Sequence, residues 1–180
     1  SCEDAFLLAT WAQAIDPKAI FGVGPVLHKG EDKTFPGGFR TCSEKAPNAR
    51  GVRMVLEACT STAPLEVDAF FDRTAKGIGC LVVTGNQPSA WVTEPALDSI
   101  KASGANVIQL DTLPNRLTPL ASVVLPTATF AEKSGTFQNR DGRLQAFERA
   151  IAPLFYCKSE CQLALDLTAA LRGESSQRLH

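Results

Sequence analysis

A run of polar groups between Glu132 and Gln145 could hold an anionic ligand. The stretch "EKSGTFQNRDGRLQ" contains two glycines and two arginines, together with Asn139 and Asp141. Glycine lets backbone N–H groups approach a ligand closely, and arginine pairs with phosphate or carboxylate through parallel hydrogen bonds. The same letters also predict an ordinary hairpin that turns at Asp141-Gly142 and places Phe137 and Leu144 on one face. Both interpretations remain open from these residues alone.

Two further polar clusters follow apolar runs that are typical of buried strands. One is "TGNQP" (84–88), which contains Gly85 and Asn86, and the other is "LDTLPN" (110–115), which contains Asp111. In open parallel sheets, ligands bind outside the carboxyl ends of the strands. Gly, Asn, Asp and Pro are also common turn residues, so a purely structural role is the alternative.

Composition excludes several classes of function. The 180 residues have 44% hydrophobic and 21% charged residues and a net charge of −1, which fits a globular domain and gives no electrostatic case for nucleic acid. No apolar run is long enough for membrane insertion. The six cysteines form no C-x-x-C pair, and only two histidines are present. We therefore predict no catalytic residue and no metal ligand, and reduced cysteines in a cytosolic protein, with Cys59 and Cys80 in the core.

Periodicity and breaker residues predict an α/β order of elements. We expect strands at 19–27, 78–83 (buried on both faces), 105–110 and 121–126, and a polar loop at 28–49. Ser1 and Ser159 are candidate helix caps, the latter in a capping box with Gln162, and Pro64 is a candidate helix start. The expected helices are 1–15, 50–59, 64–76, 94–104 and 159–172, followed by a frayed polar tail at 174–180.

The order "LVVTGNQP", "VIQLD", "ASVVLPTATFAEKSGTFQNRDGRLQ" and a closing helix resembles the molybdopterin oxidoreductase superfamily. The stretch "FAEKSGTFQNRDGRLQ" and the upstream "SCEDAFLLATWAQAIDPKAIFGVGPV" and "EKAPNARGVRMVLEA" are most similar to one branch of it, the G subunits of NADH-quinone oxidoreductase (respiratory complex I). The family motif is matched at a set of seven positions: Glu132, Gly135, Thr136, Asn139, Gly142, Arg143 and Gln145.

The resemblance implies a fold and a division of the chain. The fold is an α/β, parallel-sheet, Rossmann-like three-layer domain of the domain II/III type, with a terminal hairpin and helix. Residues 1–60 are the N-terminal helical and loop part, 61–173 the molybdopterin-oxidoreductase-like domain and 174–180 the tail. The implied cofactor-binding residues are Gly85, Asn86, Asp111, Gly135, Thr136, Asn139, Gly142 and Arg143.

Departures from the family pattern favour the complex I branch, whose pterin site is generally degenerate. Ser122 replaces the usual Asp, Gln87 is inserted in the glycine loop, and "TLPNRLTPLA" lacks a Thr-Glu-Thr-like segment. The resemblance then implies that this chain binds no cofactor. Molybdopterin guanine dinucleotide would bind only if the cleft is still functional, and the iron–sulfur clusters belong to an N-terminal part that this sequence lacks.

Three functions follow as alternatives from the resemblance. The first is a C-terminal fragment of an electron-transfer subunit of NADH-quinone oxidoreductase, whose partners are the other subunits, in the cytoplasm on the peripheral side of an inner-membrane complex. The second is a fragment of an active molybdopterin enzyme such as a formate dehydrogenase alpha subunit. The third is a non-catalytic scaffold domain that docks partner subunits.

A geometric hypothesis joins the candidate site residues. Residues 84–88, 111 and 135–143 should line one cleft at the carboxyl edge of the parallel strands. If that cleft is a vestige, Arg143 should pair with Asp141, Glu132 or a strand-end carbonyl. Glu132 and Lys133 themselves are expected to form a solvated pair or a structural contact.

Overall fold

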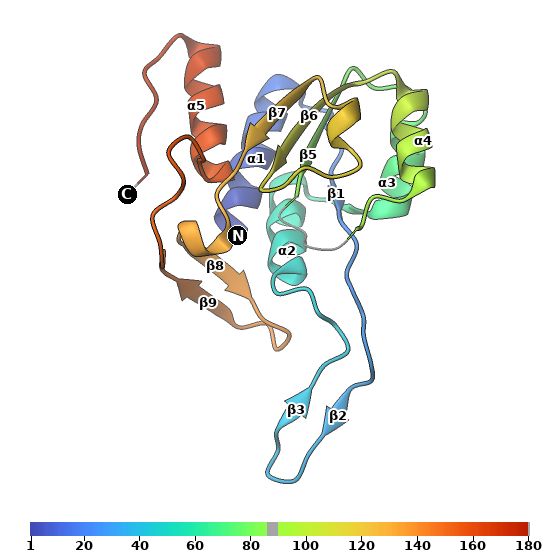
Figure 1. Ribbon diagram of the computed structural model, residues 1–180, viewed down its shortest axis with the longest axis vertical. Coiled ribbons are helices and arrows are strands. Elements are labelled where there is room, and N and C mark those ends of the chain that lie inside the picture. Colours follow the sequence, from blue (N-terminus) through green and yellow to red (C-terminus); the bar gives the residue numbers. More distant parts are fainter. Residues whose placement is uncertain (86–89, 180) are drawn as a thin grey trace.

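The computed structural model describes residues 1–85 and 90–179, which form a mixed α/β fold (Figure 1). Helices form where the apolar spacing and caps predict them. They are α1 (Cys2–Ile15), α2 (Ala49–Thr60), α3 (Val67–Thr74), α4 (Glu94–Ser103) and α5 (Glu160–Arg172), with short 3-10 turns η1 (Thr118–Leu120) and η2 (Phe130–Glu132). None of these described helices is long and apolar enough to cross a membrane.

The largest described sheet is parallel, as predicted, and has the strand order β5-β6-β7. The described strands are β1 (Gly22–Val23), β2 (Lys33–Thr34), β3 (Arg40–Thr41), β4 (Leu65–Glu66), β5 (Cys80–Thr84), β6 (Asn106–Asp111), β7 (Val123–Pro126), β8 (Gly135–Gln138) and β9 (Leu144–Phe147). β1 pairs with β4 in parallel, whereas β2–β3 and β8–β9 are antiparallel hairpins. The strands thus fall into small separate sheets.

Helix α4 connects β5 to β6, and local signals in the sequence set both ends of this helix. The Thr93 side chain accepts a hydrogen bond from the Ala96 N–H, and Gly104 ends the helix in the left-handed conformation at φ 66°. Pairing then aligns Thr84 with Leu110 and Asp111 with Pro126. The carboxyl ends of the three strands therefore meet at one edge of the sheet.

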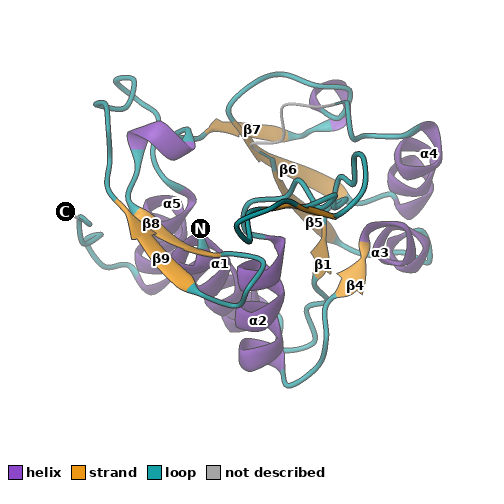
Figure 2. Cartoon of the chain, turned by 90° about the horizontal axis from the view of Figure 1, so that it is seen from below, coloured by secondary structure: helices purple, strands orange, loops and turns teal. Residues whose placement is uncertain are grey.

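Two apolar clusters hold the elements together. In the first, Phe71 of α3 and Ile100 of α4 pack with Leu81 and Val107 of the parallel sheet. The second centres on Ala9 of α1, with partners from β1 and α2. Figure 2 shows α3 and α4 grouped beside the sheet, while α1, α2 and α5 lie together near the β8–β9 hairpin. The hairpin thus rests on a helical layer rather than on the sheet itself.

Three local predictions were wrong. Pro64 does not start a helix, because Leu65 and Glu66 first pair with β1 and α3 begins only at Val67. Strand β5 is not buried on both faces: Leu81 is buried, but Cys80 is exposed at the strand's start. Cys80 is therefore not the core residue that its apolar neighbours suggested.

Residues 27–45, predicted as a loop, form a two-stranded ribbon that projects from the body of the fold (Figure 1). We call this ribbon the arm. Its strands are held by Lys45 N–H donating to Leu27 O at 2.7 Å, Lys29 N–H donating to Ser43 O at 2.8 Å, and the β2–β3 pairing. The long polar segment is therefore an ordered hairpin rather than an irregular connection.

The terminal hairpin forms as predicted, but its register differs from the expected one. Phe137 pairs with Gln145 and Gln138 with Leu144, so Phe137 and Leu144 lie on opposite faces. Phe137 instead meets Phe147, with ring centroids 4.5 Å apart.

The tail after α5 is not frayed as expected. The Gln162 side chain donates to Gln177 O at 2.8 Å and accepts from the Leu179 N–H at 2.8 Å, so the tail folds back along the helix. Ser159 caps α5 as predicted, by accepting from the Gln162 N–H. The Gln162 side chain therefore bonds to the tail and does not complete the predicted capping box.

Candidate functional site

Gly85 and Asp111 lie against each other at the carboxyl edge of the sheet. The Gly85 N–H donates to Leu110 O at 2.8 Å. A Cβ placed on Gly85 would come within 1.9 Å of a carboxylate oxygen of Asp111. The glycine is thus required by a close approach, as predicted, but the group that approaches it is a side chain of the same protein.

Asp111 is a buried carboxylate that organises the loop after β6. It accepts hydrogen bonds from the Thr112 N–H at 2.7 Å and from Asn115 Nδ2 at 2.8 Å. Asn115 in turn accepts from the Leu117 N–H at 2.8 Å. Asn86, the neighbouring predicted site residue, lies outside the described residues, as do Gln87 and Pro88.

Gly135 and Thr136 dock the hairpin onto the first turn of α1. The Thr136 N–H donates to a carboxylate oxygen of Glu3 at 2.8 Å. A Cβ on Gly135 would come within 2.5 Å of Ser1 Cβ and 3.1 Å of the Glu3 carboxylate. Burial opposes the charge on Glu3, but the hydrogen bonds from Thr136 and its neighbours hold the pKa of Glu3 below its usual value.

Asn139 and Gly142 build the turn of the hairpin. The Asn139 side-chain oxygen accepts from the Asp141 N–H at 3.0 Å and from the Arg143 N–H at 2.9 Å, and its nitrogen donates to Gln145 Oε1 at 3.2 Å. Gly142 adopts the left-handed conformation at φ 78°, which a type I turn followed by a bulge needs. The Asn139 side-chain oxygen is therefore used by the turn, and its nitrogen makes one hydrogen bond across the hairpin.

Arg143 does not behave as the vestige hypothesis predicted. Its exposed guanidinium makes no ion pair within the described part of the chain. Asp141 pairs instead with Arg40 at 3.5 Å. Glu132 accepts hydrogen bonds from the Thr129 and Leu154 N–H groups, which hold the pKa of Glu132 below its usual value.

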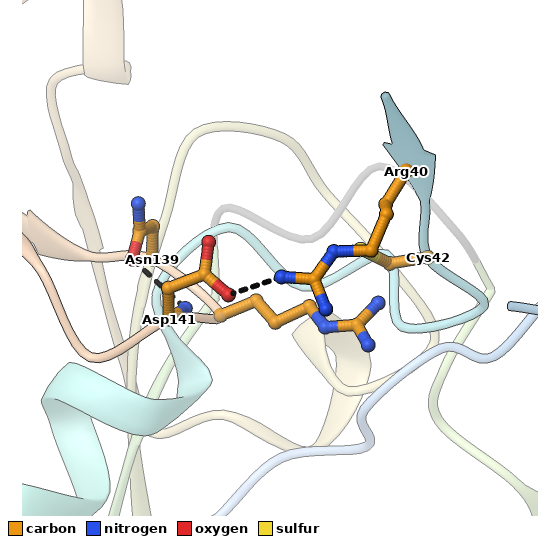
Figure 3. A pocket seen from close by; sticks show the side chains of 5 residues that line it. Arg40, Cys42, Asn139 and Asp141 are labelled. Atoms are coloured by element: carbon orange, nitrogen blue, oxygen red, sulfur yellow. Dashed lines mark hydrogen bonds and ion pairs between the residues drawn. The ribbon is translucent and has the colours of Figure 1, made fainter. Parts of the chain in front are cut away.

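A shallow hollow of about 120 Å³ lies between the hairpin turn and the arm (Figure 3). Arg40 reaches from β3 toward Asp141, and Arg140 pairs with Asp32 at 2.8 Å. Arg40 and Arg140, the two arginines that line the hollow, are thus already paired with carboxylates of the hairpin and the arm. The hollow is a junction between two hairpins rather than a site for an anion.

The most buried ionic group in the region was missed from the sequence. Lys133 Nζ lies 2.8 Å from Asp4 Oδ2 and 2.5 Å from Glu160 Oε2, and all three side chains are nearly inaccessible. Lys133 was expected to be solvated or structural, and the structural alternative is confirmed. Asp4 lies in the first turn of α1 and Glu160 in that of α5, so no sequence spacing could have grouped them.

Lys133 and Glu160 also link the hairpin to the sheet edge. The Thr84 hydroxyl at the end of β5 donates to Glu160 Oε1 at 3.5 Å, and Lys133 precedes the hairpin by two residues. The base of the hairpin therefore lies near the carboxyl edge, while its turn lies beside the arm. The single cleft expected to be lined by residues 84–88, 111 and 135–143 stays a prediction.

Two of the three candidate glycines leave no room for an anionic cofactor among the described residues. At Gly85 the Asp111 carboxylate fills the close approach, and at Gly135 Ser1 and the Glu3 carboxylate do so, whereas nothing lies within 4 Å of the Cβ position at Gly142. A second anion beside a buried carboxylate is strongly disfavoured. The buried Gln109 Oε1 lacks a hydrogen-bond partner among the described residues, but a carbonyl oxygen attracts donors and not phosphate.

Comparison with known proteins identifies relatives across this region. Residues 61–170 match the family model described as Molybdopterin oxidoreductase. An NADH-quinone oxidoreductase G subunit of Rhizobium meliloti is 27% identical over 94% of this chain. F420-dependent formate dehydrogenase subunit alpha of Methanocaldococcus jannaschii is 33% identical over 49% of it, and NADPH-Fe(3+) oxidoreductase subunit alpha of Geobacter sulfurreducens 36% identical over 41%.

The matched relatives are much longer than this chain. The matches span 18% of the Rhizobium protein, 13% of the formate dehydrogenase subunit and 8% of the Geobacter protein. The similarity to the Rhizobium sequence extends across residues 1–60 as well as the part that the family model matches, since it covers 94% of the chain.

Proposed function

Because the chain belongs to the molybdopterin oxidoreductase family, we propose that it is part of an electron-transfer subunit, of the G type, in an NADH-quinone oxidoreductase. Similarity across 94% of the chain to a G-type protein supports this assignment over relatives that match about half of it or less. In this proposal the chain contributes structure to the subunit and no catalytic residue.

One observation carries the structural role. The close backbone approaches at Gly85 and Gly135, two of the three candidate glycines, are taken by the Asp111 carboxylate and by Ser1 with the Glu3 carboxylate. The Asn139 side chain, a predicted ligand of cofactor phosphates, is committed to the hairpin turn. These contacts support a pterin-type fold held together by its own carboxylates, so that the chain binds no molybdopterin guanine dinucleotide.

The proposal includes a division of labour within the longer protein. Residues 61–173 would form a Rossmann-like three-layer domain, with 1–60 as its N-terminal part. Iron–sulfur clusters, which need cysteine motifs that this chain lacks, would be bound elsewhere in the longer protein. That protein would contact the other subunits of the complex on the cytoplasmic, peripheral side of the inner membrane.

A second candidate is a fragment of an active molybdopterin enzyme. The 33% identity to a formate dehydrogenase alpha subunit over 49% of the chain favours it. The carboxylates beside Gly85 and Gly135 argue against it, because they would repel a cofactor phosphate at these two glycines. A scaffold domain without any electron-transfer assembly is the third candidate.

Affinity isolation of the native full-length protein from its own cells tests the proposal. We expect the other subunits of an NADH-quinone oxidoreductase to co-isolate in stoichiometric amounts, with NADH-dependent quinone reduction in the isolated assembly. Formate-dependent or nitrate-dependent electron transfer would instead establish the second candidate. Isolation of the protein without any electron-transfer subunit would support the scaffold alternative and contradict the proposal.

A further inference from the structure

The arm, residues 27–45, contributes almost nothing to the core of the fold. Every residue from Leu27 to Arg40 is exposed, and the described chain places the arm away from both apolar clusters. A two-stranded hairpin that contributes no core is at best marginally stable by itself. The arm therefore does little for the stability of this chain, and its extension away from the body needs another explanation.

The tip of the arm presents two neighbouring phenylalanines at a tight turn. Phe35 is 45% and Phe39 65% exposed, and their ring centroids are 5.8 Å apart. The Phe35 N–H donates to Phe39 O at 2.7 Å, and Gly37 and Gly38 take positive φ values of 85° and 84°. The turn thus displays the two phenylalanine rings together as an apolar knob.

Ionic contacts fix the direction of the arm. Arg40 pairs with Asp141 and Asp32 pairs with Arg140, which joins both strands of the arm to the turn of the β8–β9 hairpin. The Asp32 carboxylate also accepts from the Ser43 N–H at 2.8 Å. These contacts lie at the flank of the arm and leave the phenylalanine tip unobstructed.

The charged residues within the tip itself, from Lys33 to Arg40, are these two cations, and Glu31 and Asp32 precede Lys33. Arg40 already pairs with Asp141, and Asp32 with Arg140. Neither strand of the tip carries a carboxylate to neutralise Lys33, which makes no ion pair within the described part of the chain. Lys33 is the cation of the tip that a partner can still pair with, so an apolar pocket with a carboxylate at its rim suits this tip.

We propose that the arm docks into an apolar, acid-rimmed pocket of a neighbouring protein subunit, with Phe35 and Phe39 as the anchoring side chains. Aromatic anchors in a desolvated pocket supply most of the affinity of many protein interfaces. The identity of that neighbour as a member of an NADH-quinone oxidoreductase rests on the proposed function, whereas the chemistry of the pocket rests on the arm alone.

Photo-crosslinking tests the proposal in the native full-length protein. Phe39 is replaced by photoreactive p-benzoyl-phenylalanine, the cells are irradiated, and crosslinked peptides are identified by mass spectrometry. We expect a crosslink to one protein subunit, at an apolar surface flanked by Asp or Glu. Crosslinks only within the same chain, or only to lipid with binding of the protein to phosphatidylcholine–phosphatidylserine vesicles, would overturn the proposal.

Matched variants separate docking from folding. The double variant Phe35→Ser/Phe39→Ser should reduce the amount of the crosslinking partner that co-isolates by about tenfold, as expected for a hot spot. Phe6→Ser, at a half-exposed phenylalanine on α1, should not. Lys33→Glu should also weaken co-isolation, and Lys18→Glu, which makes the same change in net charge, should not. The unfolding temperatures should all stay within about 3 °C of wild type.

The two proposals fail differently. If the wild-type protein and the arm variants co-isolate equally well with an NADH-quinone oxidoreductase, the docking proposal is wrong and the proposed function stands. If the arm crosslinks to a protein from another kind of assembly, the docking proposal stands and the proposed function is wrong.

Discussion

Lys133 and Asp4, which are 129 residues apart in sequence, meet through an ammonium–carboxylate contact of 2.8 Å in the interior of the protein. Glu160 completes the group on the other side of Lys133. The contact ties the first turn of α1, the first turn of α5 and the base of the hairpin to one point. The parts of the chain that the sequence separates most widely are thus held together by charge as well as by apolar packing.

Replacing Lys133 with Met should strongly destabilise the chain. The change removes the ammonium group that the buried carboxylates of Asp4 and Glu160 share, and breaking comparable buried pairs costs about 3–5 kcal/mol. Lys101→Met is the matched control, because Lys101 is exposed and pairs with Asp98 at 3.8 Å on the surface. That control should cost at most about 1 kcal/mol. Urea unfolding measures both, and equal losses in the two variants would show that the buried group is not stabilising.

The contribution of Lys133 should depend on pH at both extremes. Burial opposes both charges, but Lys133 lowers the pKa of Asp4 below its usual 3.8, and Glu160 and Asp4 raise the pKa of Lys133 above its usual 10.5. Because the pKa of Asp4 is lower in the folded state, its carboxylate stabilises the fold at pH values above its unfolded-state pKa, and this stabilisation is lost as the pH falls through the folded-state pKa. Because the pKa of Lys133 is higher in the folded state, its ammonium group stabilises the fold at pH values below its unfolded-state pKa, and this stabilisation is lost as the pH rises through the folded-state pKa.

The difference in unfolding free energy between wild type and Lys133→Met should therefore be largest between about pH 4 and pH 10 and shrink outside that window. Unfolding measured across the pH range tests this. A difference that stays constant from acid to alkaline pH would mean that the Met variant is destabilised by packing and not by charge.

Gly85→Ala should destabilise the sheet edge. The new methyl would come within 1.9 Å of the Asp111 carboxylate, which Thr112 and Asn115 hold in place. We expect a loss of about 1–3 kcal/mol, typical of overpacking. Gly79→Ala, at the other end of β5, meets nothing within 4 Å and should change stability by less than about 0.5 kcal/mol. A Gly85 variant as stable as the Gly79 variant would show that Asp111 can move away freely.

Local signals in the sequence predicted the helices and the parallel strands, because caps and breakers act within a few residues. Ser1 caps α1 in a capping box with Asp4, and Gly104 ends α4 in the left-handed conformation. The predictions were wrong where pairing with a distant segment determines the secondary structure. Pro64 could have opened a helix, but β1 recruits Leu65 and Glu66 into a strand from more than forty residues away.

The candidate site was only partly predictable for the same reason. Residue types and strand periodicity were enough to infer that another group approaches Gly85 closely and that Asp111 lies at the end of a strand. The contact between Gly85 and Asp111 could not be inferred, because it depends on the pairing of β5 with β6. The Lys133 cluster depends on three elements packing together, and its residues have the types most often found solvated.

The isolated 180-residue chain should be colourless and inactive with NADH. It contains no cysteine motif for an iron–sulfur cluster and no dinucleotide fingerprint, so we expect no visible absorbance and no NADH oxidation with ferricyanide as acceptor. Iron and labile sulfide assays check the first expectation. Stoichiometric iron with labile sulfide, or NADH turnover by the chain alone, would contradict it.

The central claim is that the family's cofactor-binding fold is structural in this protein, and the molybdenum and pterin content of the native full-length protein tests it most directly. Metal analysis by mass spectrometry and fluorescence detection of the oxidised pterin, both normalised to protein, give the two ratios. The occupation of Gly85 and Gly135 by Asp111 and Glu3 predicts that both ratios lie far below one per protein. Molybdenum and pterin guanine dinucleotide in one-to-one proportion with the protein would contradict the account.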